Sequence, residues 1–308
     1  MKLVEFKKTR WGVEFKKNRY LYLMIIPPLV WLLIFNYWPL YGVIIAFQDF
    51  SLRQGYFRSE WVGLKHFVYL FQKGAFQRAF WNTWIINALR IGVGFPVPVI
   101  FALLINEVRN HNYQRAVQTI TYLPHFISWV VLAGIFNSLL ALDTGAVNHL
   151  LATLGLSRID FLQSNKTFRA VIVLTDIWKE FGWETIIYLS AMAGIDPQLY
   201  EAAWVDGAGR WKQVWYITLP SIASTTIIVL LLRLGYILTM GFEQIYNLYS
   251  PLVYESGDII QTYIVRMLQE RPNFSRLAAA GLVSSVIGFV LLLAANRLVK
   301  LLGREGIY

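Results

Sequence analysis

The chain has 308 residues, of which 56% are hydrophobic and only 15% charged. This balance excludes an ordinary soluble globular domain and is typical of a polytopic membrane protein. The absence of cysteine excludes a disulfide framework and thiol chemistry. The formal net charge of +10 could indicate nucleic-acid binding. Basic residues of a membrane chain first set its orientation, however, and the sequence has no basic patch interleaved with aromatic residues, so we expect no nucleic-acid partner.

The chain begins with a basic segment. Residues 1–19 carry seven Lys or Arg and two Glu, which predicts a cytoplasmic tail beside anionic membrane lipid. An apolar run follows over 20–47. It is longer than the apolar region of a signal peptide and has no evident cleavage site of small residues, so we interpret it as an uncleaved span. Three prolines predict kinks in this span: Pro27, Pro28 and Pro39.

Five further apolar runs complete the prediction of an all-α membrane protein with six transmembrane helices. They cover 83–105, 120–142, 171–195, 222–241 and 277–296. Each has about the 20 residues needed to cross a hydrocarbon core of about 30 Å. We expect a kink at Pro124 in the third span and an outer segment at 242–276.

The density of Lys and Arg favours both termini in the cytoplasm. The predicted organisation is a basic tail at 1–19, a six-span domain at 20–300 and a second cytoplasmic tail at 301–308.

A polar, helix-forming loop at 196–220 lies between the fourth and fifth spans. Asp196 followed by Pro197 predicts a helix N-terminus, and Gly207 lies where this first short helix would end. A second short helix can run over 210–217 until Pro220 stops it. Helix, glycine turn and helix on the membrane surface would form a knob that a partner protein can bind.

The side chains of this loop suit a docking role. Ala202 and Ala203 keep the first helix slim enough to enter a cleft, and Glu201 and Asp206 offer charge-assisted contacts there. The alternative interpretation is an ordinary amphipathic connector.

At these residues the sequence resembles the EAA loop of ABC importer permeases, which reads EAA, DGA, an aromatic residue and I-x-LP. The matching positions are Glu201, Ala202, Ala203, Asp206, Gly207, Ala208, Ile217, Leu219 and Pro220. Val214 departs from the family pattern, in which Phe is more common. The stretch 61–83 also resembles the family's lead-in to the second span, with His66 where Asn is usual. The stretch 241–248 resembles the subgroup that handles complex oligo- and polysaccharides.

The resemblance implies the type I ABC importer permease fold with a cytoplasmic EAA coupling loop. It implies that eight residues couple the chain to an ATPase: Glu201, Ala202, Ala203, Asp206, Gly207, Ala208, Leu219 and Pro220. The sequence has no P-loop, HExxH or GxSxG motif, and its four histidines lack the spacing of a metal site. We therefore expect neither an enzyme nor a cofactor in this chain, with ATP and Mg bound by a partner ATPase.

Six charged residues fall inside the predicted spans, where each is costly unless it faces a partner or water. They are Arg90, Asp176, Lys179, Glu180, Glu184 and Arg233. Helical spacing groups several of them with aromatic residues on one face. One interpretation is a substrate pathway lined by Lys179, Glu180, Trp183, Arg233, Tyr236 and Met240. Its aromatic rings, Trp183 and Tyr236, would stack on sugar rings. The resemblance to maltose-type permeases implies that sugar binds near mid-membrane on the helices that flank the EAA loop.

The alternative interpretation of these charges is internal ion pairing, Asp176 with Lys179 or Glu180 with Arg233. Arg90 would be structural or would extend outward to the membrane surface. Two intramembrane cations in a basic chain also raise the hypothesis that the substrate is an anionic oligosaccharide such as a uronate.

The resemblance as a whole implies a permease subunit of a binding-protein-dependent ABC importer that moves oligosaccharide across the bacterial inner membrane by alternating access. Its expected partners are a second homologous permease, a cytoplasmic ABC ATPase dimer and an extracytoplasmic solute-binding protein. A permease for a peptide or a neutral monosaccharide would share the loop and differ in the pathway. A passive channel is the rival from another class.

Overall fold

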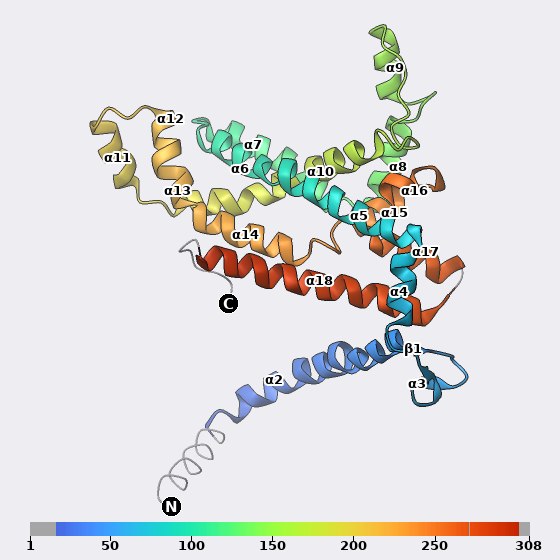
Figure 1. Ribbon diagram of the computed structural model, residues 1–308. Coiled ribbons are helices and arrows are strands. Elements are labelled where there is room, and N and C mark those ends of the chain that lie inside the picture. Colours follow the sequence, from blue (N-terminus) through green and yellow to red (C-terminus); the bar gives the residue numbers. More distant parts are fainter. Residues whose placement is uncertain (1–16, 271, 302–308) are drawn as a thin grey trace, which may run out of the picture. The chain divides into compact units, whose positions relative to one another are not determined.

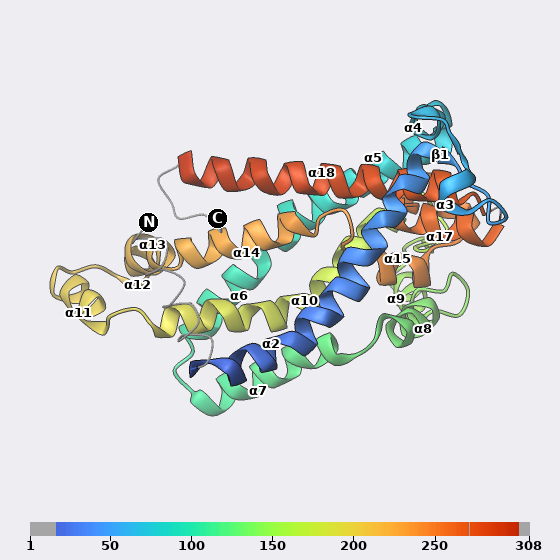
Figure 2. The ribbon, with the colours of Figure 1, turned by 90° about the horizontal axis from the view of Figure 1, so that it is seen from below.

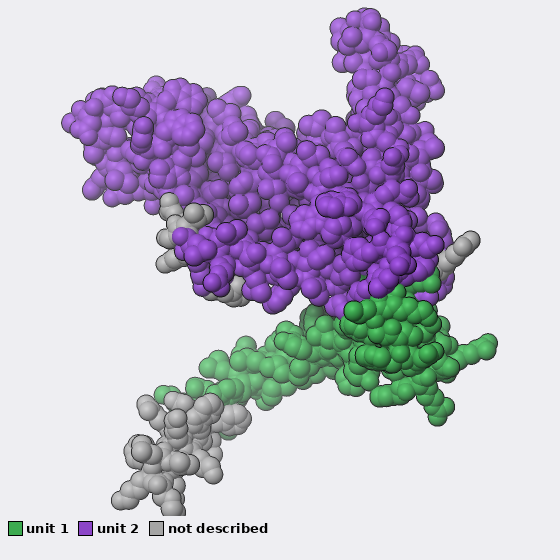
Figure 3. All heavy atoms as spheres, in the orientation of Figure 1, with its two compact units in different colours: residues 1–66, 274–279 green, residues 67–273, 280–308 purple. Residues whose placement is uncertain are grey.

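The computed structural model describes residues 17–270 and 272–301, and the chain divides into two units (Figure 3). Unit 1 comprises residues 1–66 and 274–279, and unit 2 comprises residues 67–273 and 280–308. The predicted tails at 1–19 and 301–308 lie almost wholly outside the described residues. The described part of both units is mainly helical, as the sequence predicts.

Unit 1 contains the first predicted span. Helix α2 (Arg19–Leu32) includes Pro27 and Pro28 and continues into a π-helical turn η1 (Leu33–Tyr37) and a 3-10 segment η2 (Trp38–Phe47). Pro39 lies in the first turn of η2 and has no N–H group to donate to the turn before it, which accounts for the departure from α geometry in η1 and η2, whereas α2 stays α-helical through Pro27 and Pro28. The side chains of α2 are exposed, as expected of a span that packs against lipid or another chain.

A small antiparallel pairing follows the first span. Strand β1 (Gln48–Asp49) pairs with β2 (Glu60–Trp61), and helix α3 (Gly55–Arg58) lies between them. The buried His66 ring forms a 3.0 Å hydrogen bond with the carbonyl of Gln48. Burial lowers the pKa of His66 from its ordinary value.

Unit 2 is built around α10 (Phe168–Ala193), a helix of 26 residues. Helices α5, α6, α7, α14 and α15 all pack against it (Figures 1 and 2). The remaining helices, in chain order, are α4 (Lys65–Gln72), α5 (Gly74–Leu89), η3 (Arg90–Gly94), α6 (Pro96–Asn106), α7 (His111–Tyr122), η4 (Leu123–Phe126), α8 (Trp129–Leu139), α9 (Ala146–Thr153), α11 (Pro197–Val205), α12 (Arg210–Gln213), η5 (Val214–Thr218), α13 (Leu219–Ser221), α14 (Ala223–Gly235), α15 (Phe242–Leu248), η6 (Pro251–Val253), α16 (Tyr254–Gly257), α17 (Ile260–Glu270) and α18 (Phe274–Leu301).

The third predicted span is broken, not merely kinked. The segments His111–Phe126 and Trp129–Leu139 meet at an angle of 101°. Pro124 lies inside η4, and the break comes after it, where Ile127 is extended and Ser128 begins α8. The Ser128 hydroxyl accepts a hydrogen bond from the Val131 N–H, so a new N-cap starts here.

The fifth predicted span also differs from the expectation. Helix α14 ends at Gly235, a turn occupies 236–241, and Gly241 adopts a left-handed φ of +77° before α15. The segment 242–276 was expected to lie outside the membrane, which stays a prediction. Its helix α15 packs against α8 and α10, and the side chain of Gln244 is fully buried. The core at this end of unit 2 includes Ile172 and Ile245.

Membrane-crossing capacity follows from length and composition. Within the described residues, three helices are long and apolar enough to cross a membrane, Arg19–Phe47, Gly74–Asn106 and Phe274–Leu301, and five are if each bent pair counts as one span. Helix α10 is not among these, because four charged residues lie between positions 176 and 184. Six spans are reached only if α10 also crosses the membrane, with its four charged residues paired or facing water.

Candidate functional site

The loop at 196–220 has the predicted helix, glycine turn and second helix. The carboxylate of Asp196 accepts a hydrogen bond from the Gln198 N–H at 3.0 Å and caps α11. Gly207 has a φ of +74°, and a Cβ there would meet no atom within 4 Å. The left-handed backbone, not a lack of space, therefore favours glycine at this turn.

The second helix of the loop runs further than predicted. Helix α12 continues through the π-helical turn η5 into α13, so Pro220 lies inside the helical segment and does not end it. A π turn widens the hydrogen-bond ladder just where proline cannot donate, which makes this continuation possible. Arg210 in α12 forms an ion pair with Glu107, directly after α6, at 3.4 Å, which connects the loop to the rest of unit 2.

The predicted coupling residues lie on an exposed surface. Glu201, Ala202, Asp206, Gly207 and Pro220 are exposed, and Ala203, Ala208 and Leu219 are half-buried. Trp204 and Val205 beside them are also exposed. Large apolar side chains gathered on a surface are typical of a protein–protein contact. Figures 1 and 2 show α11 and α12 at the opposite end of unit 2 from α9 and α15.

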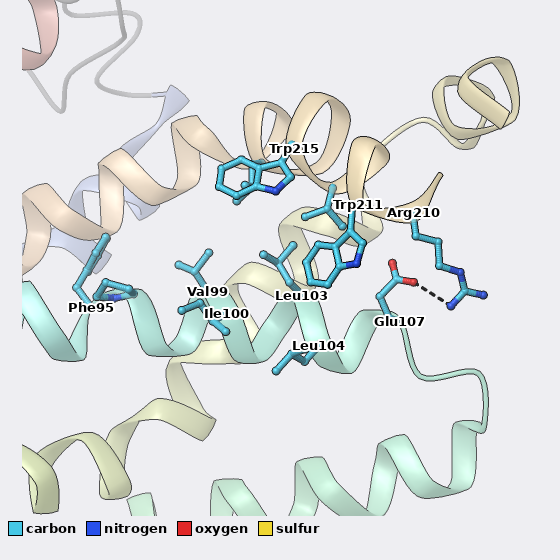
Figure 4. Close-up of a pocket in the computed structure, with 12 residues that line it drawn as sticks. Phe95, Val99, Ile100, Leu103, Leu104, Glu107, Arg210, Trp211 and Trp215 are labelled. Carbon is cyan, nitrogen blue, oxygen red and sulfur yellow. Dashed lines mark ion pairs between the residues drawn. The ribbon is translucent and has the colours of Figure 1, made fainter. Parts of the chain in front are cut away.

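An apolar groove lies beside this loop, between α6 and the α12–η5 segment (Figure 4). It has a volume of about 700 Å³. Trp211 and Trp215 face Val99 and Leu103 across it, and the Arg210–Glu107 ion pair lies at one end.

The charged residues of the spans form inter-helix pairs around α10, but not those named from the sequence. Arg90 is 1% exposed, and its Nε lies 3.5 Å from a carboxylate oxygen of Asp176. Its other nitrogens donate to the carbonyl of Met240, at 3.1 Å, and to the side chain of Gln244. Arg90 is therefore structural and does not extend outward. It holds the turn that follows α14, and a Cβ on Gly241 would collide with its guanidinium.

Lys179 ties the broken third span to α10. It is 5% exposed and donates to the carbonyl of His125 at 2.6 Å. It also lies 3.1 Å from the carboxylate of Glu180 and 5.6 Å from the centre of the Trp129 ring. A cation at the end of a helical segment compensates carbonyls that have no partner within the helix. Lys179 thus points at the break, with its ammonium group beside the carbonyl of His125, and its role in a substrate pathway stays a prediction.

Glu180 and Trp183 meet around His125, one of the four histidines for which the sequence analysis found no metal-site spacing. The Nδ1 atom of His125 lies 2.7 Å from the carboxylate of Glu180. The His125 and Trp183 rings are stacked, with centroids 4.5 Å apart and planes 2° apart. Trp183 remains 40% exposed, and Phe126 contacts its edge. One sequence feature could have drawn attention to His125: it is a polar residue directly after Pro124, inside the apolar run at 120–142.

Arg233 pairs with Glu184 and lies over the ring of Phe95 at 5.6 Å. Tyr236 is 68% exposed, and Met240 is half-buried. The predicted pathway residues therefore fall into separate groups: Lys179, Glu180 and Trp183 around His125, Arg233 against Glu184, and Tyr236 with Met240 in the turn after α14. The alternative interpretation named the pairs Asp176 with Lys179 or Glu180 with Arg233. These partners were wrong, because Asp176 pairs with Arg90 and Arg233 pairs with Glu184.

A close backbone contact supports this arrangement. A Cβ on Gly182 would collide with the carbonyl of Thr121, so glycine lets α7 and α10 approach closely just before the break. Among the described residues, no group of three or more His, Asp or Glu could hold a metal ion.

Helices broken within apolar segments, paired charges at the breaks and an exposed loop of two short helices define the membrane component of a transporter. The chain belongs to the family of binding-protein-dependent transport system inner membrane components, whose match covers residues 94–304.

The similarity extends over nearly the whole chain. The polygalacturonan/rhamnogalacturonan transport system permease protein YteP of Bacillus subtilis is 43% identical over 302 residues, 98% of this chain and 94% of that protein. Protein LplB of the same organism is 42% identical, over 98% of this chain and 95% of LplB. More distantly, the sn-glycerol-3-phosphate permease protein UgpA of Yersinia pestis is 31% identical over 70% of this chain and 72% of UgpA.

Solved structures are also similar to this chain, and two of them are named here for their coverage. One is a bacterial ABC transporter involved in the import of the acidic polysaccharide alginate, with a TM-score of 0.89 and 43% identity over 94% of this chain and 98% of that one. The other is a bacterial alginate ABC transporter in complex with an alginate pentasaccharide-bound periplasmic protein. Its TM-score is 0.89, with 42% identity over 96% of this chain and 98% of that one.

Proposed function

We propose that this chain is the permease subunit of an ATP-driven importer that moves acidic oligosaccharides across the cytoplasmic membrane by alternating access. The observation that carries the proposal is the near full-length similarity to permeases named for polygalacturonan and rhamnogalacturonan and to an alginate importer. These polymers are rich in uronic acids, so the shared chemistry of the substrates is a pyranose ring that bears a carboxylate.

The exposed loop at 196–220 is the proposed coupling element. Glu201 and Asp206 would contact a cytoplasmic ABC ATPase dimer, which binds the ATP and Mg, and Gly207 would keep the turn between the two short helices. One chain supplies one loop, whereas an ATPase dimer has two clefts, so a second permease subunit completes the transporter. In this arrangement α10 is the fourth of six spans, both termini lie in the cytoplasm, and a solute-binding protein docks on the outer face.

The paired charges limit what can contact the sugar. Lys179 and Arg233 are each neutralised by an acidic partner, and Lys179 is buried. The exposed aromatic rings of Trp183 and Tyr236 are therefore the better candidates for stacking on sugar rings. Apolar ring faces of this kind bind pyranoses without demanding a particular charge, so the recognition of a carboxylate needs a further group.

The test is a reconstituted transporter in liposomes, containing this chain, its partner permease, the ATPase and the binding protein. Oligogalacturonate or alginate oligosaccharide should stimulate ATP hydrolysis and be taken up, whereas maltooligosaccharide and peptide should do neither. Stimulation by a peptide or a neutral monosaccharide would point to the alternative solute class. Uptake that persists without ATP would point to a channel.

The coupling role has its own test. Gly207→Pro and Glu201→Lys should each abolish substrate-stimulated ATP hydrolysis and leave membrane insertion intact. Gly155→Pro is the matched control, because Gly155 also has a φ of +74° and open space around it but lies next to α9. Normal stimulation in the Gly207 and Glu201 variants would contradict the docking role.

A further inference from the structure

A second cavity of unit 2 lies beside α8 and α15, at the end opposite the exposed loop at 196–220 (Figures 1 and 2). Its lining comes from three stretches of the chain, 137–144, 160–163 and 247–250, and we call it the polar pocket. It has a volume of about 520 Å³. Small-molecule sites have volumes of about 300–1,000 Å³, so the polar pocket is large enough for a ligand.

The lining combines hydrogen-bonding groups with apolar surface. Asn137 and Gln163 supply exposed amides and Thr144 supplies an exposed hydroxyl. Within the described residues, none of these three side chains has a hydrogen-bond partner. Tyr249 adds an aromatic ring and Leu248 an aliphatic side chain. A pyranose carries hydroxyl groups at its edge and C–H groups on its ring faces, so this lining offers what a sugar needs.

The charges of the polar pocket are acidic. Asp143 and Asp160 line it, and no Lys, Arg or His is among its described lining residues. Asp143 forms an ion pair with Arg158. Asp160 is half-buried, and its Oδ1 atom accepts from the Gln163 N–H at 3.0 Å. In the part of the chain that the structure describes, Asp160 has no cationic partner.

This charge distribution separates two kinds of sugar unit. The carboxylate of a uronic acid would meet the carboxylate of Asp160 with no cation between them, and such like-charge contacts are unfavourable. The hydroxyl groups of an uncharged sugar can instead donate to Asp160 in charge-assisted hydrogen bonds. The polar pocket therefore favours a neutral unit.

Helix α15 connects the polar pocket with the candidate substrate pathway. Tyr236 and Met240 lie in the turn before α15, and Tyr249 lies just after it. Its seven residues span about 10 Å, a length comparable to that of a disaccharide. Aromatic contacts follow the helix: the Phe242 and Tyr246 rings have centroids 5.4 Å apart, and the Tyr246 and Tyr249 rings 6.0 Å apart. A sugar chain can thus occupy the polar pocket and the turn together.

We propose that the polar pocket binds one uncharged pyranose unit of the transported oligosaccharide. Hydroxyl groups of this unit donate to Asp160 and bond to the amides of Asn137 and Gln163, and one face of its ring packs on Tyr249. This inference rests on the proposed function and adds a specificity to it. The preferred substrate contains a neutral unit beside its acidic units, and a fully acidic oligosaccharide binds more weakly.

The experiment uses the complete transporter in lipid nanodiscs and two ligands that differ only in charge. One ligand is oligogalacturonate, and the other is the same oligosaccharide with alternate carboxyl groups reduced to alcohols. ATP hydrolysis gives the half-saturating concentration of each ligand, and hydrogen exchange is measured at saturation. The alternately reduced ligand should slow exchange at 137–144, 160–163 and 247–250 more than oligogalacturonate does, because its neutral unit enters the polar pocket.

The variant Asp160→Asn keeps an oxygen that can accept from the Gln163 N–H and removes the charge that repels a carboxylate. It should lower the half-saturating concentration of oligogalacturonate by about tenfold, and should not lower that of the alternately reduced ligand. The binding protein is unchanged, so its own preference cancels when variant and unaltered transporter are compared. Glu243→Gln is the matched control: it removes an exposed charge of α15 that does not line the polar pocket, and should shift neither ligand.

Three outcomes would overturn the inference. They are equal protection by the two ligands, an unchanged response of Asp160→Asn to oligogalacturonate, and an equal shift for both ligands in this variant. The last is expected if the polar pocket receives a loop of the binding protein instead of a sugar. The first comparison needs no variant, so it holds even if Asp160→Asn does not fold. Failure of both ligands to stimulate ATP hydrolysis would refute the proposed function as well, whereas normal stimulation with any of the three outcomes would refute only the role of the polar pocket.

Discussion

Replacing Asp176 by Asn should destabilise the chain strongly, because it leaves the guanidinium of Arg90 buried without a counter-charge. The two groups are 3.5 Å apart, and Arg90 is 1% exposed. At an effective dielectric constant of about 20, two charges at this separation attract by about 5 kcal/mol. Removing one partner of a buried pair typically costs about 3–5 kcal/mol. Arg90 keeps its bonds to Met240 and Gln244, so we expect a loss near about 3 kcal/mol.

The control is Asp143→Asn, which breaks the pair of Asp143 and Arg158. This pair has a similar separation of 3.2 Å, but the Asp143 side chain is 82% exposed. An exposed pair contributes less than about 1 kcal/mol. Thermal denaturation of the purified transporter, followed by size-exclusion chromatography, measures both variants. At about 2 °C per kcal/mol, Asp176→Asn should lower the midpoint by roughly 6 °C and Asp143→Asn by less than about 2 °C.

A double variant adds a second check. Arg90→Met removes the charge that Asp176→Asn leaves unpaired, so the loss in the double variant should be smaller than the sum of the two single losses. The reasoning fails if Asp176→Asn is as mild as Asp143→Asn, or if the two single losses simply add.

Three further predictions follow from the same contacts. Gly182→Ala should lower stability by about 1–3 kcal/mol, because its methyl group would press on the carbonyl of Thr121; Gly281→Ala in α18, where a Cβ meets nothing, should be neutral or slightly stabilising in the same thermal assay. Asn148→Ala should increase proteolysis of the segment 141–159, because the buried amide bonds both of its ends. Burial lowers the pKa of His66, so the folded state favours the neutral ring and stability should fall as the pH drops below 6.5; hydrogen exchange at residues 48–61 should rise at pH 5.5 relative to pH 7.5, and His66→Gln should remove that difference.

The local structure of the loop at 196–220 could be predicted in detail because its signals are local. Asp196 caps a helix through its own side chain, and Gly207 adopts the left-handed conformation that its position after α11 suggested. Each of these features depends on residues a few positions apart, which a single sequence contains. Pro220 was misjudged because a π turn upstream of it accommodates the missing N–H group.

The breaks in the third and fifth spans could not be predicted, because they depend on residues far away in the chain. His125 gives up a helical hydrogen bond at its carbonyl and receives one from Lys179, which is 54 positions later. The turn before α15 is held by Arg90, which is 150 positions earlier. Hydropathy alone reads each of these regions as one continuous span. The choice of ion-pair partners failed for the same reason, since helical spacing shows which charges share a face but not which neighbouring helix that face meets.

Along α10, the positions committed to holding neighbouring helices alternate with positions that are accessible. Asp176, Lys179 and Glu184 each anchor another segment, whereas Trp178 and Trp183 remain 45% and 40% exposed. With this arrangement, an exposed aromatic residue of α10 could be replaced during evolution without disturbing the charged residues that hold the neighbouring helices. By contrast, Asp176 or Glu184 could be replaced without leaving an unpaired charge only if its arginine partner on another helix, Arg90 or Arg233, changed as well.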